Sequence, residues 1–244
     1  MENSLLIGLS RQMVMQREMA TIANNIANMN TPSYKSEKML FEEYVMKNAT
    51  EQSPDKTLSF VQDFGLNRDM SDGALQTTGN PLDVAITGDG FFKIQSANGA
   101  TLYTRNGHFQ LDDQGQLITS NGDPVLSDAG SPIRFATDEK DINIARDGSI
   151  TTSVGERGKI AMVAFANPQN MKYEGNTLLS TPEAEVPTTG TRLIQGALEG
   201  SNVKPIAEMT NMIEVQRSYE SASKLIETAD DMRNRAISTL GQAA

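Results

Sequence analysis

The chain has 244 residues, sparse aromatic residues and a net charge of −10, so it is long enough for one large domain or two small ones. It contains no cysteine, which excludes disulfides, thiolate catalysis and cysteine-based zinc sites. The acidic balance argues against nucleic acid and anionic membranes as partners, because an acidic surface repels phosphate.

Membrane and secretion signals are absent from the pattern. No apolar run approaches the roughly 18 residues that a membrane-spanning helix needs. The start, MENSLLIGLSRQ, is acidic and has only a short apolar patch, whereas a secretory signal begins basic and has a longer apolar core. We therefore expect a cytoplasmic chain, or one exported without a cleaved signal peptide.

The first predicted element is a helix over residues 3–30. Its apolar residues step by three and four along the chain, which is a heptad-like seam. Thr31-Pro32 ends the pattern, since proline disfavours helix in the residue before it. The apolar members of this predicted seam are Leu6, Leu9, Met13, Ala20, Ala23 and Ala27.

Four asparagines lie close together at the end of this helix: Asn24, Asn25, Asn28 and Asn30. Asparagine is a poor helix former, because its amide competes with the backbone for hydrogen bonds. Polar residues in a helical seam cost stability but fix register and partner number. We therefore expect these amides to specify which neighbours the helix accepts.

Residues 33–81 are polar and mixed, with little periodicity. We interpret this segment as an extended connector, with an exposed loop at 49–57. From about 82 to 202 the chain changes character. Short β-prone runs such as FFKIQ alternate with glycine-containing turns such as Asn106-Gly107, which predicts an all-β domain of hairpins.

The last predicted element is a long helix within residues 203–244. No glycine or proline interrupts 206–240, and Pro205 suits a first helical turn. Roughly 35 residues would span about 50 Å. Its apolar stripe again steps by three and four, through Met212, Val215, Tyr219, Ala222, Ile226, Ala229, Ala236 and Leu240.

These elements predict a discontinuous α+β fold. Residues 1–32 and 203–244 form a terminal helical assembly domain that pairs in a coiled-coil-like way, 33–81 form the connector, and 82–202 form the β domain. A lone amphipathic helix is marginal by itself. The two apolar stripes and the four asparagines are therefore the predicted assembly contacts.

The sequence gives only weak support for a catalytic, nucleotide-binding or metal-binding site. The only histidine, His108, lacks the partners that a metal site or a triad needs. Gly88-Asp89-Gly90 lacks the third glycine of a dinucleotide loop, and Asp112-Asp113-Gln114-Gly115 lacks the spacing of a calcium loop. We expect no catalytic residue, cofactor, metal or small-molecule substrate.

Three long motifs resemble the flagellar rod and hook protein family, in the order found there. They are IANNIANMNTPSYK near the start, GNPLDVAITGDGFFKIQ with LYTRNGHFQLDDQGQLITSNGDPV in the middle, and EGSNVKPIAEMTNMIEVQRSYESASKLIETADDM near the end. One departure is Thr31-Pro32-Ser33-Tyr34, where many members have a Thr-Gly-Tyr or Thr-Gly-Phe ending. The short connector and the LFEEY motif resemble the proximal-rod branch, with the distal-rod branch as the alternative.

The resemblance implies a structural subunit and not an enzyme. Its partners would be other copies of itself, other flagellar rod proteins and the flagellar type III export apparatus, which needs no cleaved signal. The terminal helices would stack as an inner tube around the export channel, in a rod that spans the periplasm and transmits torque from motor to hook.

Two other classes stay open from the residues alone. A secreted β-rich adhesin or binding module with a helical stalk would use the same elements. A hydrolase with a carboxylate pair is the third reading, because 31 acidic residues form many such pairs by chance.

Overall fold

A computed structural model of the chain has a long helix near each end and mostly β-structure between them. This confirms the α+β class. Neither helix, over its described residues, is long and apolar enough to cross a membrane. The structure describes residues 2–47, 57–136, 139, 141–175, 177–188 and 190–242.

The helices are α1 (Glu2–Ala27) and α2 (Pro205–Gln242), with a short 3-10 helix at Pro168–Asn170. The strands are β1 (Glu37–Lys47), β2 (Thr57–Arg68), β3 (Leu75–Thr77), β4 (Val84–Thr87), β5 (Phe91–Gln95), β6 (Thr101–Thr104), β7 (Phe109–Leu111), β8 (Leu117–Thr119), β9 (Asn143–Ile144), β10 (Ser149–Thr152), β11 (Gly155–Lys159), β12 (Met162–Ala164), β13 (Lys172–Gly175), β14 (Leu178–Ser180), β15 (Val186–Pro187), β16 (Arg192–Gln195) and β17 (Ala197–Glu199).

The chain divides into two compact units. The helical unit consists of Met1–Ala27, Glu37–Asp69 and Val203–Ala244, and the β unit consists of Asn28–Ser36 and Met70–Asn202. Both units are therefore discontinuous in sequence. The expected boundary at residue 32 differs from this division, because residues 28–36 belong to the β unit, where the Ser33 N–H donates to the Glu199 carbonyl at 2.8 Å.

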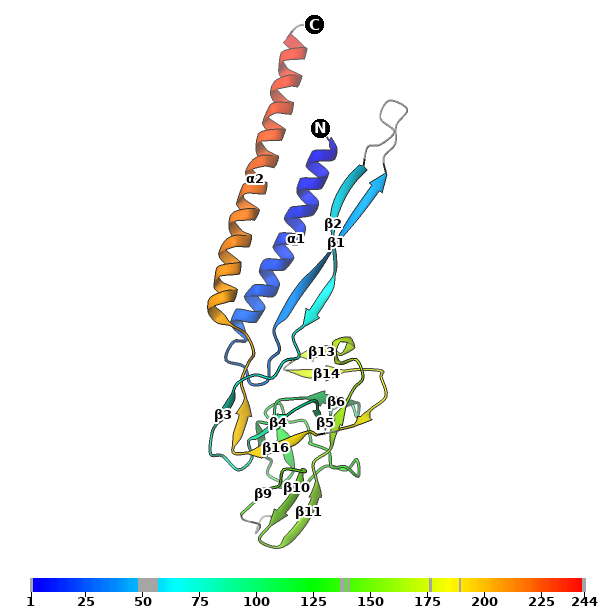
Figure 1. The fold of residues 1–244 in the computed structure, drawn as a ribbon, viewed down its shortest axis with the longest axis vertical. Coiled ribbons are helices and arrows are strands. Elements are labelled where there is room, and N and C mark those ends of the chain that lie inside the picture. The colour runs from blue at the N-terminus through cyan, green and yellow to red at the C-terminus, as the bar shows by residue number, and fades with distance from the viewer. Residues whose placement is uncertain are drawn as a thin grey trace. The chain divides into compact units, whose positions relative to one another are not determined.

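In the helical unit, α1 lies between α2 and the β1–β2 hairpin (Figure 1). The two helices run antiparallel, since Gly8 lies against Ile226 and Asn25 contacts Glu208. A Cβ added at Gly8 would come within 2.9 Å of the Ile226 side chain, so the glycine permits a close approach of the helices here.

Local signals explain where each helix begins and ends. After α1, Thr31 folds back by donating its backbone N–H to the Asn28 carbonyl and its hydroxyl to Asn28 Oδ1, both at 3.1 Å. Helix α2 begins at Pro205, whose fixed φ suits a first turn. Glu208 lies in that first turn, where a negative charge is favoured by the helix dipole.

The expected connector contains an antiparallel hairpin. Strands β1 and β2 pair from Glu37 with Arg68 to Lys47 with Thr57. The register shifts between Leu40, which pairs with Gly65, and Phe41, which pairs with Asp63. An extra residue of this kind interrupts the period of two, which hid the strands from the sequence pattern. Most of the loop predicted at 49–57 lies outside the described residues.

The β unit is built of short antiparallel strands. Its largest sheet has the order β13-β14-β6-β5-β12-β15, and the pairs β16-β4, β17-β3 and β7-β8 and the sheet β11-β10-β9 complete it. A closed core includes Ile86, Phe92, Phe109 and Leu117. The Phe92 and Phe109 rings meet edge to face at 5.0 Å. The predicted strand at Phe91–Gln95 is found with those bounds.

Candidate functional site

Helix α1 has one buried face. Val14, Met15 and Ile22 are all at most 9% exposed, and α1 contacts α2, β1 and β2. Burying each such side chain stabilises the fold by about 1.5–3 kcal/mol. None of these three residues belongs to the predicted seam, so the covered face of α1 differs from the one that the heptad pattern suggested.

The predicted seam of α1 lies on the side of the helix that the chain leaves uncovered. Leu6, Leu9 and Met13 are 51–54% exposed, and Ala20, Ala23 and Ala27 are exposed as well. At 3.6 residues per turn, this line of side chains faces away from Val14, Met15 and Ile22. We call Leu6, Leu9 and Met13 the α1 triplet. Exposed large apolar side chains in a row are typical of surfaces that take part in contacts with other molecules.

The predicted stripe of α2 is less exposed than the predicted seam of α1. Met212, Val215, Tyr219, Ala222, Ile226 and Ala229 are half-buried and form one line along the helix. Ile226 is the residue that meets Gly8 of α1. The remaining members, Ala236 and Leu240, have side chains outside the described ones.

Helix α2 also carries an apolar patch that the sequence analysis missed. Ile206 is 84% exposed, Met209 49% and Ile213 52%. Their spacing of three and four places them on one side of the helix, and this periodicity could have identified them. We call them the α2 triplet. Leu225 and Met232, further along α2, are also exposed.

The asparagine cluster divides into separate roles. Asn25 is 1% exposed; its Nδ2 donates to the Glu37 carbonyl at 2.8 Å and its Oδ1 accepts from the Glu37 N–H at 3.0 Å. Asn25 Nδ2 also lies 3.3 Å from Glu208 Oε2. Asn25 therefore joins α1, β1 and α2 within one subunit, in contrast to the expected contact with neighbours. Asn28 holds the turn after α1, while Asn24 and Asn30 are exposed.

The two glutamates that contact Asn25, Glu37 and Glu208, also line a groove. This groove of about 250 Å³ in the helical unit is lined in part by Glu18, Glu37 and Glu208. Glu37 is paired with Arg68, with 2.8 Å between Oε1 and the guanidinium. Burial raises the pKa of Glu18. The Glu37–Arg68 pair joins β1 to β2, and the Asn25–Glu208 contact joins α1 to α2.

A second buried polar cluster lies in the β unit. Glu199, 1% exposed, accepts from Lys35 Nζ at 2.6 Å, from Arg105 Nε at 3.0 Å and from the Gly73 N–H at 2.9 Å. Arg105 also pairs with Asp72 at 2.8 Å. Burial opposes ionisation of Glu199, but the charges of Arg105 and Lys35 outweigh it and lower its pKa. Burial and then the Arg105 charge lower the pKa of Lys35.

This cluster joins the three motifs singled out in the sequence. Lys35 ends the first motif, Arg105 lies in the middle one and Glu199 begins the last. Ser36 N–H also donates to Asn202 Oδ1 at 2.7 Å. The sequence analysis did not identify these residues as partners, because nothing local pairs residues that lie 164 positions apart.

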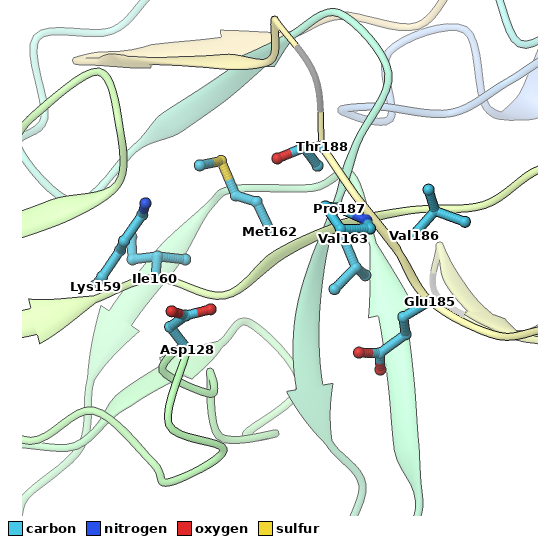
Figure 2. A pocket seen from close by; sticks show the side chains of 9 residues that line it. All are labelled: Asp128, Lys159, Ile160, Met162, Val163, Glu185, Val186, Pro187 and Thr188. Atoms are coloured by element: carbon cyan, nitrogen blue, oxygen red, sulfur yellow. The ribbon is translucent and has the colours of Figure 1, made fainter.

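The histidine and several carboxylates of the β unit, which could belong to a catalytic site, contact neighbouring side chains instead. His108 Nδ1 lies 2.8 Å from Asp83 Oδ1, and the two residues form an isolated antiparallel β-bridge. The β unit has a cleft of about 350 Å³. Figure 2 shows the side chains that line it, among them Asp128, Lys159 and Glu185. The Glu185 carboxylate is held by Tyr103 at 2.8 Å and Lys93 at 2.6 Å. Over the described ranges, no three His, Asp or Glu side chains gather as a metal site.

Three models of known protein families match separate segments of the chain. Residues 5–35 match the flagella basal body rod protein model, residues 85–152 match the flagellar hook protein FlgE/F/G D1 domain, and residues 194–239 match the C-terminal model of the flagellar basal body rod FlgEFG proteins. The first match contains most of α1, and the last match contains most of α2.

Whole-chain relatives agree with these matches. The chain is 37% identical to the flagellar basal-body rod protein FlgF of Caulobacter vibrioides and 35% identical to that of Mesorhizobium japonicum, over 99% of each chain. It is 36% identical to the rod protein FlgG of Agrobacterium fabrum, over 89% of this chain and 91% of the relative. The chain therefore belongs to the flagellar basal-body rod protein family.

Proposed function

We propose that this chain is an axial subunit that builds the flagellar rod through its two terminal helices. The observation that carries the proposal is the α1 triplet, continued by Ala20, Ala23 and Ala27. It forms a seam at heptad spacing that stays exposed among the residues that the structure describes. In the rod, helices of neighbouring subunits would cover it in a coiled-coil-like arrangement.

The contrast between the buried and the exposed face of α1 supports this proposal. Val14, Met15 and Asn25 bind α1 to its own subunit, whereas Leu9 and Met13 remain available to others. Small alanines further along the seam permit close approach, since interhelical distance depends on side-chain size at the contact. The same contact repeated without closing a ring builds a helical array of subunits.

Transport and position are parts of the same proposal. The subunit would be exported by the flagellar type III apparatus without a cleaved signal. The helices would line the export channel in the periplasmic rod and help to transmit torque. We favour the proximal position, because both FlgF relatives match over 99% of their length, whereas the FlgG relative of Agrobacterium fabrum matches over 91%.

The direct test is deletion of the gene, followed by electron microscopy of isolated basal bodies and a swimming assay. We expect non-motile cells whose basal bodies lack a complete rod and hook, and restoration of both by the wild-type gene. The point at which the rod stops reports the position of the subunit. Motile cells with complete rods and hooks would overturn the proposal and favour the adhesin reading.

A further inference from the structure

Two exposed apolar patches in the helical unit share the same spacing. The α1 triplet lies at positions 6, 9 and 13, and the α2 triplet lies at 206, 209 and 213. Both step by three and then four residues, as in the seam of two packed helices. Each of the six side chains is about half exposed or more.

The two triplets lie at different heights within one subunit. Gly8 lies against Ile226, and Asn25 contacts Glu208. This antiparallel register places Leu9 level with Lys224 and Leu225 of α2. Met209 is therefore about 15 residues away along the helix axis, or roughly 22 Å at 1.5 Å per residue. The triplets of one subunit do not meet each other.

We propose that the α2 triplet at the start of one subunit's C-terminal helix packs on the α1 triplet of the adjacent rod subunit, displaced by roughly 22 Å along the helix axis. This inference rests on the proposed function and specifies its contact. The partner is the C-terminal helix of a rod-family subunit that carries the same apolar triplet, either another copy or a related chain. The family match over residues 194–239 includes this part of α2.

A helix suits the α1 triplet better than the other exposed apolar surface of the unit. Leu40, Phe41 and Leu66 of the hairpin are 44–55% exposed, but strand side chains alternate with a period of two. They present no line at steps of three and four. The α2 triplet has that line and is itself without cover inside its subunit.

The proposed contact joins two different surfaces, so it is heterologous. Each subunit has a free α1 triplet on one side of the contact and a free α2 triplet on the other. Such contacts do not close between two subunits but continue from one to the next. Subunits joined by this staggered contact would therefore form an open-ended array.

Disulfide cross-linking tests the stagger, because the chain has no cysteine of its own. Cells would carry full-length Leu9→Cys/Met209→Cys as the only copy. In further strains, Leu9→Cys would be combined with a cysteine at the Met209-aligned position of each other rod protein in turn. Isolated basal bodies would be oxidised and run on non-reducing gels. We expect one of these pairings to give a cross-linked adduct that is lost in both single-cysteine strains.

The matched control is Leu9→Cys with Lys224→Cys, or with a cysteine at its aligned position. Lys224 lies 18 residues after Ile206, five full turns along the same side of α2, and at the height of Leu9. A disulfide requires Cα atoms within about 7 Å, and one turn is about 5.4 Å, so an error of one or two turns abolishes it. We expect no adduct from this control.

The outcomes separate the contact from the function. An adduct from the Lys224 pairing, or from Leu9→Cys with Phe41→Cys, in place of the Met209 pairing would overturn the stagger. Complete basal bodies that contain the cysteine chain but give no adduct would overturn it as well, and would leave the rod function standing. Complete basal bodies that lack the chain altogether would overturn the proposed function itself.

Discussion

In the β unit, Phe92, Phe109 and Leu117 lie in a closed core, whereas in the helical unit Leu6, Leu9 and Met13 are about half exposed. Of the sixteen large apolar side chains that are exposed among the described ones, eleven belong to the helical unit. The other five belong to the β unit. Exposed apolar side chains gathered in one part of a chain are typical of a surface that binds other molecules, and this is the role that we propose for the helical unit.

The largest expected effect comes from breaking the cluster that closes the β unit. Glu199→Gln removes the charge that Lys35 and Arg105 share. Lys35 then loses its carboxylate partner, and Arg105 keeps only its pair with Asp72. We expect the free energy of unfolding to fall by about 3–5 kcal/mol, measured by urea denaturation of the full chain. Asp72→Asn, at a half-exposed partner of Arg105, should cost under about 1 kcal/mol. Equal losses in both variants would contradict the central role of Glu199.

Two methionines test the difference between the buried and the exposed face of α1. Met15 is 6% exposed and Met13 is 52% exposed, although they are two positions apart. Met15→Ala should lower the free energy of unfolding by about 2–5 kcal/mol, because it leaves a cavity. Met13→Ala should change it by less than about 0.5 kcal/mol. The helical circular dichroism signal during urea denaturation reports both, and similar losses would mean that the faces are assigned wrongly.

Asn25→Ala is expected to have the next largest effect. The substitution leaves the buried backbone N–H and carbonyl of Glu37 without their partner. We expect a loss of about 1–3 kcal/mol in the free energy of unfolding. The exposed Asn30 gives the control, and Asn30→Ala should stay within about 0.5 kcal/mol. A neutral Asn25→Ala would show that this amide does not join α1 to the hairpin.

Acidic pH gives the smallest expected effect. The folded-state pKa of Glu199 lies below its ordinary value of 4.5, so this group stabilises the fold above that value. Its contribution is lost as the pH falls from about 4.5 through the folded-state pKa, because the unfolded chain binds the proton first. Denaturation at a series of pH values should show this loss in the wild type. An equal slope in Glu199→Gln would assign the loss to other carboxylates.

Local signals in the sequence predicted the elements that depend on them. Pro205 and the uninterrupted run after it predicted α2, and glycine turns predicted the short strands of the β unit. The choice of the buried face of α1 depends on tertiary contacts, because both faces carry apolar residues such as Met13 and Met15. The bulge beside Leu40 hid the hairpin, and the link between Lys35 and Glu199 spans too much chain to be visible in a single sequence.

The account depends most on the claim that the exposed face of α1 serves assembly and not folding. The direct test is electron microscopy of basal bodies from cells whose only copy carries Leu9→Glu and Met13→Glu, since glutamate keeps a good helix propensity. We predict that the purified variant keeps the wild-type free energy of unfolding, while cells are non-motile with incomplete rods. Complete rods and hooks containing the variant would contradict the claim.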